Sequence, residues 1–442
     1  MPKNKTLKEI EKAFAFTLPR MRKFIKDFHM DMKKGLSGRR SSLKMIPEYL
    51  KRPSGKEKGS FVALDLGGTN FRVLSIKLKG ARLTGKPVTR KYKLEKKHIK
   101  KTGKELFDFI ADCIKNFLKE NKISLNKENN IGFTFSFPVR KKGPASGVLI
   151  HWTKDFEATG VAGKDVVLLL NRSLERKGLT NTRVTALAND TVSTLVAKSY
   201  KDPHCDVGVI LGTGTNACYP ERFSNVKKLK KRKNLSGEMI INIEWGNFNR
   251  IPLSSYDVKL DKATWNPKEQ ILEKMVSGMY LGELTRLVIE DLEASKIIFK
   301  THHRTIFNKP GAFRTEYMSL AEKDDSETLA GINKLLRRMK IKKSTYEERK
   351  LLKYVCRLVS TRAARISAAA MASVITRMDP AVSRPHTVAI DGSVYEKHPG
   401  FSKRIRTALK EIFKNKEKNI RISLTKDASS KGAAILAAAN ST

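Results

Sequence analysis

Three short turns contain the residue types that bind phosphate. They occupy residues 65–70, 212–216 and 391–393, and each combines glycine with acidic, amide or hydroxyl residues. Glycine lets the backbone point N–H groups at a phosphate, Thr or Ser adds a donor, and a neighbouring Asp suits magnesium held through water. Each turn alone is typical of a β-hairpin. The three together favour nucleotide binding, although none matches a Walker A or a Rossmann glycine motif.

A second group of polar residues stands where the surrounding sequence is apolar. Polar side chains at such positions are costly unless they are hydrogen-bonded, so each is either a satisfied structural residue or part of a binding site. Carboxylates and amides that gather in one cleft suit a ligand rich in hydroxyl groups. The group consists of Ser136 in FTFSFP, Thr153 and Lys154 after Trp152, Asn189, Asp190, Asn216, and Glu244 in INIEWG.

These residues need a framework of strands and helices to position them. Apolar runs predict strands at residues 61–64, 71–76, 131–137, 207–211 and 387–390, and amphipathic spacing predicts helices at 105–118 and over most of 266–372. The first two glycine turns each join two strands and lie about 145 residues apart, which is a weak indication of internal duplication. Strands and helices mix throughout, so the chain belongs to the α/β class.

The composition limits the molecule further. A chain of 442 residues with 40% hydrophobic content is long enough for two domains. Four widely spaced cysteines favour a reduced protein without a zinc site. We expect no transmembrane segment and no secretory signal, because no apolar run is long enough and the first residues alternate between charged and apolar types. A cytoplasmic location, as a monomer or a homodimer, is the resulting expectation.

The net charge is unusual. The chain has 89 Lys and Arg against 44 Asp and Glu, a formal charge of +45 that is spread along its whole length. Such a charge attracts polyanions in general. The densest run, residues 227–233, is interpreted as a solvated loop, with a nuclear localisation signal as the alternative, and no stacking aromatics interleave with it. We therefore expect no specific nucleic-acid partner.

Longer segments around these residues resemble one known family. LDLGGTNFRV is similar to the first phosphate motif of the eukaryotic hexokinases and glucokinases. Further segments look like other motifs of that family, in the family's order: FTFSFPV, HWTKDF, ALANDTVSTLV, GVILGTGTNACY, INIEWGNF, ILEKMVSGMYLGEL and DGSVYEKHPGF. The similarity extends over nearly the whole chain.

The resemblance implies an actin-like sugar kinase fold, in which two ribonuclease-H-like α/β domains face each other across a cleft. It places a small domain at residues 59–190, joined by the C-terminal helix at 427–442, and a large domain at 1–58 and 191–426. The implied activity is that of an ATP-dependent hexokinase with Mg²⁺ as cofactor. This activity is the transfer of the γ-phosphate of MgATP to the 6-hydroxyl of glucose, mannose or fructose, the first step of glycolysis.

The resemblance also implies roles for individual residues. Asp190 is the implied general base, and Lys154 belongs with it to the catalytic set. The implied sugar-binding residues are Ser136, Thr153, Lys154, Asn189, Asp190, Asn216, Glu244, Gln270 and Glu273. The implied nucleotide-binding residues are Asp65, Gly67, Gly68, Thr69, Asn70, Arg72, Gly212, Thr213, Gly214, Gly392, Ser393, Ser429 and Ser430, and Asp65 also holds magnesium through water.

The chain departs from the family's pattern at two places. Asp155 stands where the family has Gly after the Thr-Lys pair, and Ala428 and Ser430 stand at Gly positions of the last motif. We expect Asp155 to stiffen the sugar loop or to add a charge near it. Ala428 and Ser430 reduce backbone freedom near the nucleotide, so we expect an effect on adenosine affinity rather than on catalysis. The alternative function is a catalytically weak, polyanion-binding protein on a hexokinase scaffold. A third interpretation is an actin-like ATPase or chaperone relative. The sugar-facing residues argue against it, because a pure ATPase has no need of them.

Overall fold

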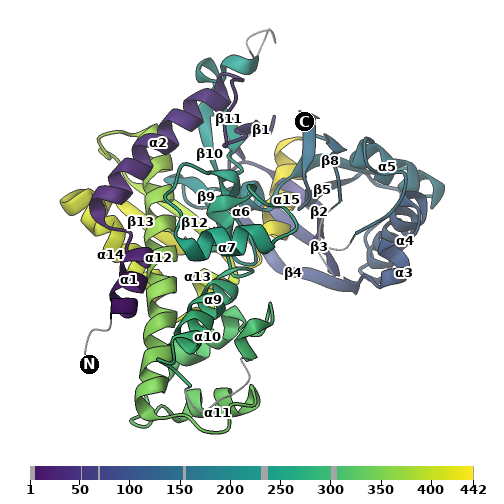
Figure 1. Cartoon of the computed structure of the whole chain (residues 1–442). Helices are drawn as coiled ribbons and strands as arrows, with labels where there is room; N and C mark the ends of the chain where they lie inside the picture. Colours follow the sequence, from purple (N-terminus) through teal and green to yellow (C-terminus); the bar gives the residue numbers. More distant parts are fainter. Residues whose placement is uncertain are drawn as a thin grey trace.

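The computed structural model describes residues 5–50, 52–67, 70–152, 156–229, 237–299 and 306–441, without the side chains of Lys5 and Asn70. Two large β-sheets form the framework, and each lies in its own lobe (Figure 1). We call the part around the five-stranded sheet the first lobe and the part around the six-stranded sheet the second lobe.

The two sheets repeat one topology. The first has the strand order β4-β3-β2-β5-β8, and the second has the order β1-β11-β10-β9-β12-β13. In each sheet a hairpin (β2–β3 or β9–β10) is antiparallel, and two more strands follow in parallel (β5 and β8, or β12 and β13). The strands are β1 (Ile46–Pro47), β2 (Lys58–Leu66), β3 (Asn70–Lys79), β4 (Arg82–Lys93), β5 (Asn129–Phe135), β8 (Thr182–Ala188), β9 (Cys205–Leu211), β10 (Thr215–Arg222), β11 (Glu238–Asn242), β12 (His386–Asp391) and β13 (Ile420–Leu424). The repeat bears out the duplication that the two glycine turns indicated.

Helices of the first lobe begin at caps that the sequence encodes. The lobe contains α3 (Lys96–Ile99), α4 (Gly103–Glu120) and α5 (Val166–Arg176). In α4 the N–H of Glu105 donates to the Thr102 hydroxyl at 3.2 Å, and the N–H of Thr102 donates to the Glu105 carboxylate at 3.1 Å. This capping box satisfies backbone donors that the helix itself leaves unpaired. A small hairpin, β6 (Val139–Gly143) and β7 (Ser146–Leu149), lies beside β8.

Two helices, α6 (Asp190–Ser199) and α15 (Ala428–Ala439), join the lobes. α15 packs against α6, β2 and β5, and α6 also packs against β9, so the pair lies between the two sheets (Figure 1). Glycine permits these close approaches. A Cβ on Gly432 would lie 1.8 Å from the carbonyl oxygen of Ser193, and one on Gly132 would lie 1.8 Å from that of Ala433. Any side chain at these two positions would push the central elements apart.

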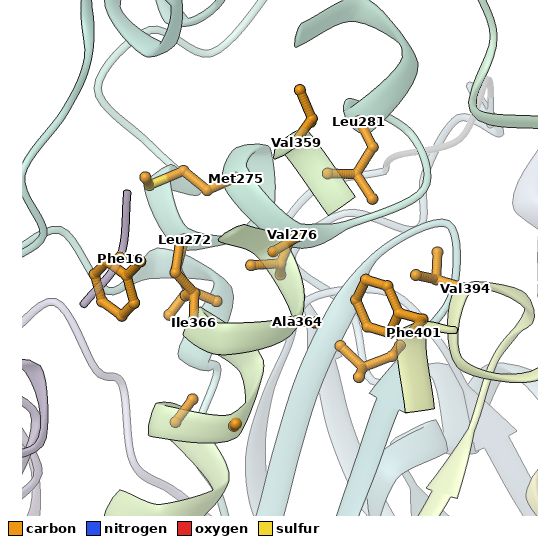
Figure 2. Close-up of a cluster of buried hydrophobic side chains, with 14 of the residues drawn as sticks. Phe16, Leu272, Met275, Val276, Leu281, Val359, Ala364, Ile366, Val394 and Phe401 are labelled. Carbon is orange, nitrogen blue, oxygen red and sulfur yellow. The ribbon is translucent and has the colours of Figure 1, made fainter. Parts of the chain in front are cut away.

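Helices make up most of the second lobe. They are α1 (Lys5–Phe14), α2 (Leu18–Leu36), α7 (Ser255–Ala263), α8 (Ile271–Val276), α9 (Leu281–Ala294), α10 (Thr315–Lys323), α11 (Ala330–Arg338), α12 (Tyr346–Met378), α13 (Ser393–Lys397) and α14 (Phe401–Phe413). Figure 2 shows apolar side chains of α8, α12 and α14 meeting in its core, among them Leu272, Ile366 and Phe401. α12 has the length and composition of a membrane span, but 83% of its most apolar window is buried inside the protein.

Buried apolar side chains form three clusters. One fills the second lobe, one fills the first lobe, and one lies around α6 and α15 between the sheets. All four cysteines are buried and free: Cys356 belongs to the second lobe, Cys113 to the first, and Cys205 and Cys218 to the cluster between the sheets. Burial raises the pKa of Cys113 to about 11 and that of Cys205 to about 12.

The elements confirm the predicted α/β class and most of the predicted strands. Each predicted strand coincides with β2, β3, β5, β9 or β12, although β5 ends at Phe135 and leaves residues 136–137 outside it. The sequence did not predict strands β1, β4, β6, β7, β8, β11 and β13. The sheet boundaries fall near the proposed domain limits, but the division into domains at 59–190 with 427–442, and at 1–58 with 191–426, stays a prediction.

Candidate active site

The segment between β8 and α6 places Asn189 and Asp190 at the edge of the first sheet. Asn189 caps α6, because its Oδ1 accepts the N–H of Thr191 at 2.8 Å and the hydroxyl of Thr191 at 2.6 Å. Asp190 is in the first turn, and its Oδ1 also accepts the Thr191 N–H at 2.8 Å. A helix N-terminus favours negative charge. The half-buried carboxylate of Asp190 is therefore held in place at a helix end.

Three polar residues of the second lobe, on or next to its sheet, are connected to one another by side-chain hydrogen bonds. The side-chain amide of Asn216, on β10, donates to the side-chain oxygen of Asn242 at 2.8 Å and to Glu244 at 3.2 Å. Asn242 donates to the same Glu244 oxygen at 2.9 Å. Glu244 itself has a left-handed backbone (φ 56°), which turns the chain sharply after β11. The network fixes the direction in which a carboxylate and two amides present their polar atoms.

Asn242 was not among the predicted site residues. It is 4% exposed and completes the network between Asn216 and Glu244. A signal for it was present in the sequence, because Asn242 and Glu244 are the two polar residues of INIEWG.

Gln270 and Glu273 come from the start of α8 and lie beside the turn of the second sheet. Glu273 accepts the backbone N–H of Thr215 at 2.9 Å. A Cβ on Gly214 would lie 2.7 Å from a Glu273 oxygen, and one on Gly246 would lie 2.4 Å from the Gln270 side-chain oxygen. A side chain at either glycine would displace these polar atoms, and the close approach brings the predicted residues Gln270 and Glu273 next to the β9–β10 turn.

A small cavity brings the two groups together. It has a volume of about 50 Å³, and Asn189, Asn242 and Glu244 are among its lining residues, with Phe135 and Phe137 on the first-lobe side. Ser136 lies between those two phenylalanines, at the end of β5, where its N–H donates to the carbonyl of Leu66 at 3.4 Å. Polar residues from both sheets thus border one space between the lobes, as a cleft for a hydroxyl-rich ligand requires.

The first phosphate turn lies beside the start of α15. Asp65, at the end of β2, accepts hydrogen bonds from the hydroxyls of Ser429 at 2.6 Å and Ser430 at 3.2 Å. Arg72, on β3, donates to Asp427 at 2.7 Å. Ser430, which stands at a family Gly position, thus adds a second hydroxyl to the Asp65 carboxylate. The structure brings four predicted nucleotide-binding residues together: Asp65, Arg72, Ser429 and Ser430.

The second and third turns meet in the second lobe. A Cβ on Gly392, whose φ is 126°, would lie 2.3 Å from the carbonyl oxygen of Leu211, so only glycine fits there. On the other side, the N–H of Gly278 donates to the carbonyl of Gly212 at 2.8 Å, and that of Met279 donates to Thr213 at 3.1 Å. Ser393, the next predicted residue, begins α13.

A cavity adjoins this pair of turns. Its volume is about 410 Å³, and it is lined by Gly278 and Met279 together with residues of α9 and of segment 310–315. Because Gly278 and Met279 are hydrogen-bonded to the second turn, the cavity lies next to the backbone that is predicted to bind phosphate. Burial also raises the pKa of Asp391, which precedes Gly392.

Several predicted residues lie outside the described residues. Gly68, Thr69, Thr153, Lys154, the side chain of Asn70 and the departure at Asp155 belong to this group, as does part of the basic run at 227–233. The predicted Gly67 is described and follows β2 directly. Among the described residues, no group of three or more His, Cys, Asp or Glu side chains could hold a metal ion alone.

Comparisons with known proteins identify the family of the chain. Two family models, both described as hexokinase, match residues 6–200 and 206–439. The chain is 40% identical to Hexokinase-7 of Oryza sativa subsp. japonica, over 91% of this chain and 89% of that protein. It is 37% identical to Hexokinase-1 of Schizosaccharomyces pombe, over 92% of this chain and 86% of that protein.

Solved structures extend the similarity to the fold. The hexokinase from Schistosoma mansoni complexed with glucose matches with a TM-score of 0.84 and 35% identity, over 97% of both chains. A second hexokinase crystal structure matches with a TM-score of 0.86 and 30% identity, over 99% of this chain and 100% of that one. These matches confirm the predicted two-domain, actin-like sugar kinase fold. The chain therefore belongs to the hexokinase family, a family of sugar-phosphorylating phosphotransferases.

Proposed function

We propose that this protein transfers the γ-phosphate of MgATP to the 6-hydroxyl of a hexose (glucose, mannose or fructose), giving hexose 6-phosphate and ADP. The observation that carries the proposal is the shared cavity between the lobes. Asn189 reaches it from the first sheet, whereas Asn242 and Glu244 reach it from the second. Such a reaction would be the first step of glycolysis, with the cytoplasm as the proposed location.

Asp190 acts as the general base in this proposal. It accepts the proton of the 6-hydroxyl while that oxygen attacks phosphorus. Proton loss can lag behind in a loose phosphoryl-transfer transition state, so an ordinary carboxylate is basic enough if it is well placed. The cap that Asn189 makes on α6, and the contact of Asp190 with the Thr191 N–H, supply that placement.

The hexose is oriented by amides and carboxylates. Asn216, Asn242 and Glu244 offer donors and acceptors in a fixed arrangement, and Glu273 is held at the neighbouring turn by the Thr215 N–H. A hydrogen bond to an ionised group contributes about 1.5–3 kcal/mol, so two or three such bonds suffice to distinguish the stereochemistry of hydroxyl groups. Ser136, Thr153 and Lys154 belong to the same proposed set.

The nucleotide is held between the glycine turns. The turns at 65–70 and 212–216 supply backbone donors for the phosphates, and the 410 Å³ cavity beside Gly278 offers room for the nucleoside. Asp65, with two serine hydroxyls at its carboxylate, is a hard oxygen site that fits a magnesium ion bound through water. The ion supplies neutralisation of the phosphate charge. Closure of the two lobes on the sugar would exclude water from the reaction.

Coupled-enzyme turnover with MgATP tests the proposal. Wild type is compared with Asp190→Asn and with Glu347→Gln, a control acid in the first turn of α12. We expect the Asp190 variant to lose about 100-fold to 10,000-fold in kcat, the usual contribution of a general base, while the control keeps wild-type activity. Glucose should support turnover and 6-deoxyglucose should not, because the latter lacks the accepting hydroxyl. Folded wild type without hexose-dependent ADP formation would refute the proposal.

A further inference from the structure

A buried ion pair connects the two lobes next to the proposed sugar site. The ammonium of Lys141 lies 3.4 Å from a carboxylate oxygen of Glu48, and the two side chains are only 2% and 3% exposed. Glu48 follows β1, and its backbone N–H donates to the carbonyl of Ile240 in the second sheet at 3.0 Å. Lys141 lies in β6 and donates to the carbonyl of Leu187 in the first sheet. The pair therefore bridges the sheets directly.

Each partner contacts one wall of the proposed sugar site. Leu187 precedes the Asn189–Asp190 segment by two residues on β8, so Lys141 holds the strand end that carries the proposed base. Glu48 receives a hydrogen bond from Asn242 and lies near the Glu244 carboxylate. Both partners line the same 50 Å³ cavity as Asn189, Asn242 and Glu244.

The backbone around Glu48 is bent to place this side chain. Met45 and Tyr49, on either side of β1 and Glu48, have φ values of 49° and 57°, which is unusual for residues other than glycine. Such strained positions persist only where the surrounding structure imposes them, and they cluster at functional sites.

Stability alone does not account for the pair. A buried ion pair contributes little compared with apolar residues of the same size, whereas removal of one partner leaves the other charge unpaired in the interior. Burial raises the pKa of Glu48 and lowers that of Lys141, and each charge opposes the shift of the other. Each group therefore counteracts the effect of burial on the charge of the other.

We propose that Glu48 and Lys141 are positioning residues that hold the two walls of the hexose site in register across the lobes. Lys141 fixes the end of β8 that leads to Asn189 and Asp190, and Glu48 fixes the Asn242–Glu244 network. The inference rests on the proposed hexose kinase function. Its consequence is that hexose affinity depends on a contact between the lobes that lies outside the nucleotide site.

Steady-state kinetics of Glu48→Gln, Lys141→Met and the double variant test this role. Each single variant should raise the KM for glucose at least 10-fold, with a smaller change in kcat and an unchanged KM for ATP. The double variant, which leaves no buried charge unpaired, should recover part of the glucose KM. Should a single variant fail to fold, the double variant and its comparison with wild type still measure the effect.

A second buried ion pair provides the matched control. Arg362 donates to both oxygens of Asp257 at 2.7 Å, inside the second lobe, and the two side chains are 3% and 4% exposed. Arg362→Met should lower the melting temperature and leave the glucose KM within twofold of wild type. The inference is overturned if the Glu48 and Lys141 variants behave like this control. If the wild-type protein showed neither turnover nor glucose binding, that result would refute the proposed function itself, and the inference with it.

Discussion

Glu244 illustrates how much of the proposed specificity depends on one side chain. One of its oxygens accepts two amide donors, Asn216 and Asn242, which set the orientation of the carboxylate. Glu244→Gln keeps the shape and removes the charge, so hydrogen bonds to the sugar weaken by about 1.5–3 kcal/mol. We expect the glucose KM to rise about 10-fold to 100-fold, because 1.4 kcal/mol corresponds to a factor of ten. Glu238→Gln, at the exposed start of β11, should have no effect on the glucose KM.

Glu293 is a residue whose charge reduces stability. It lies in the last turn of α9, is 8% exposed, and burial together with Glu290 raises its pKa to about 7. The folded state therefore favours the neutral acid. The contribution of this acid to the free energy of unfolding is complete below the unfolded pKa of about 4.3 and is lost as the pH rises through 7.

Glu293→Gln should remove this loss. The variant should gain about 1–3 kcal/mol over wild type at pH 8 and little at pH 5, which urea unfolding at the two pH values measures. Glu175→Gln, an exposed acid at the end of α5, should show no such pH dependence. An equal stability difference at both pH values would contradict the role of the Glu293 charge.

Some residues of the candidate site could be predicted from the sequence, and others could not. Asn189, Asp190 and Glu244 interrupt apolar segments, so their polarity alone marks them, and Asn242 carries the same signal. Glu48 and Lys141 carry none, because a single acid and a single lysine cannot be distinguished among 44 acidic and 89 basic residues. Only the three-dimensional contact at 3.4 Å identifies them.

Among the elements, α15 should be sensitive to the addition of a single methyl group. Gly432→Ala adds a methyl group 1.8 Å from the carbonyl oxygen of Ser193 on α6. The helix gains about 1 kcal/mol from the better propensity of Ala, but overpacking against a backbone atom outweighs this gain. We expect a net loss of about 2 kcal/mol in the free energy of unfolding, measured with denaturant. Gly143→Ala, where a Cβ meets no atom within 4 Å, is the control and should be equally stable as wild type.

Burial explains some of the differences in which strands could be predicted, although β11 is buried and was not predicted. β5, β9 and β12 are buried on nearly every residue, and their apolar runs predicted them. β4 is exposed along most of its length, because it forms the edge of the first sheet, and its basic sequence shows no alternation. β6 and β7 are too short for a recognisable period, although they carry Lys141.

For the whole molecule, the net charge of +45 allows a test against the alternative function. Nonspecific binding to nucleic acid depends on counterion release, so affinity should fall about 1,000-fold or more between 50 and 200 mM salt if six or more phosphates are contacted. Glucose turnover should persist over this range, since the proposed sugar contacts are partly buried. Salt-dependent retention on nucleic acid, without glucose turnover, would favour the polyanion-binding alternative.

The packing between the lobes could not be predicted from residue patterns, although the family resemblance implied two domains that face each other across a cleft. The two glycine turns indicated a repeated unit, but the way in which the repeats face each other follows from the close packing of α15 against α6 at Gly432 and against β5 at Gly132. No periodic pattern of apolar residues predicts close backbone contacts of this kind. Consequently the individual walls of the site were predicted, whereas the bridge between them was not.

The placement of the four cysteines has a practical consequence. Each of the three apolar clusters contains its own thiol, and burial raises the pKa of all four, so that the reactive thiolate form is scarce at neutral pH. Alkylation must then wait for local opening of the surrounding cluster. Mass spectrometry of labelled peptides would report separate opening rates through Cys113 for the first lobe, Cys356 for the second, and Cys205 with Cys218 for the junction. The cysteines of the wild-type chain can thus show whether the two lobes open locally at independent rates.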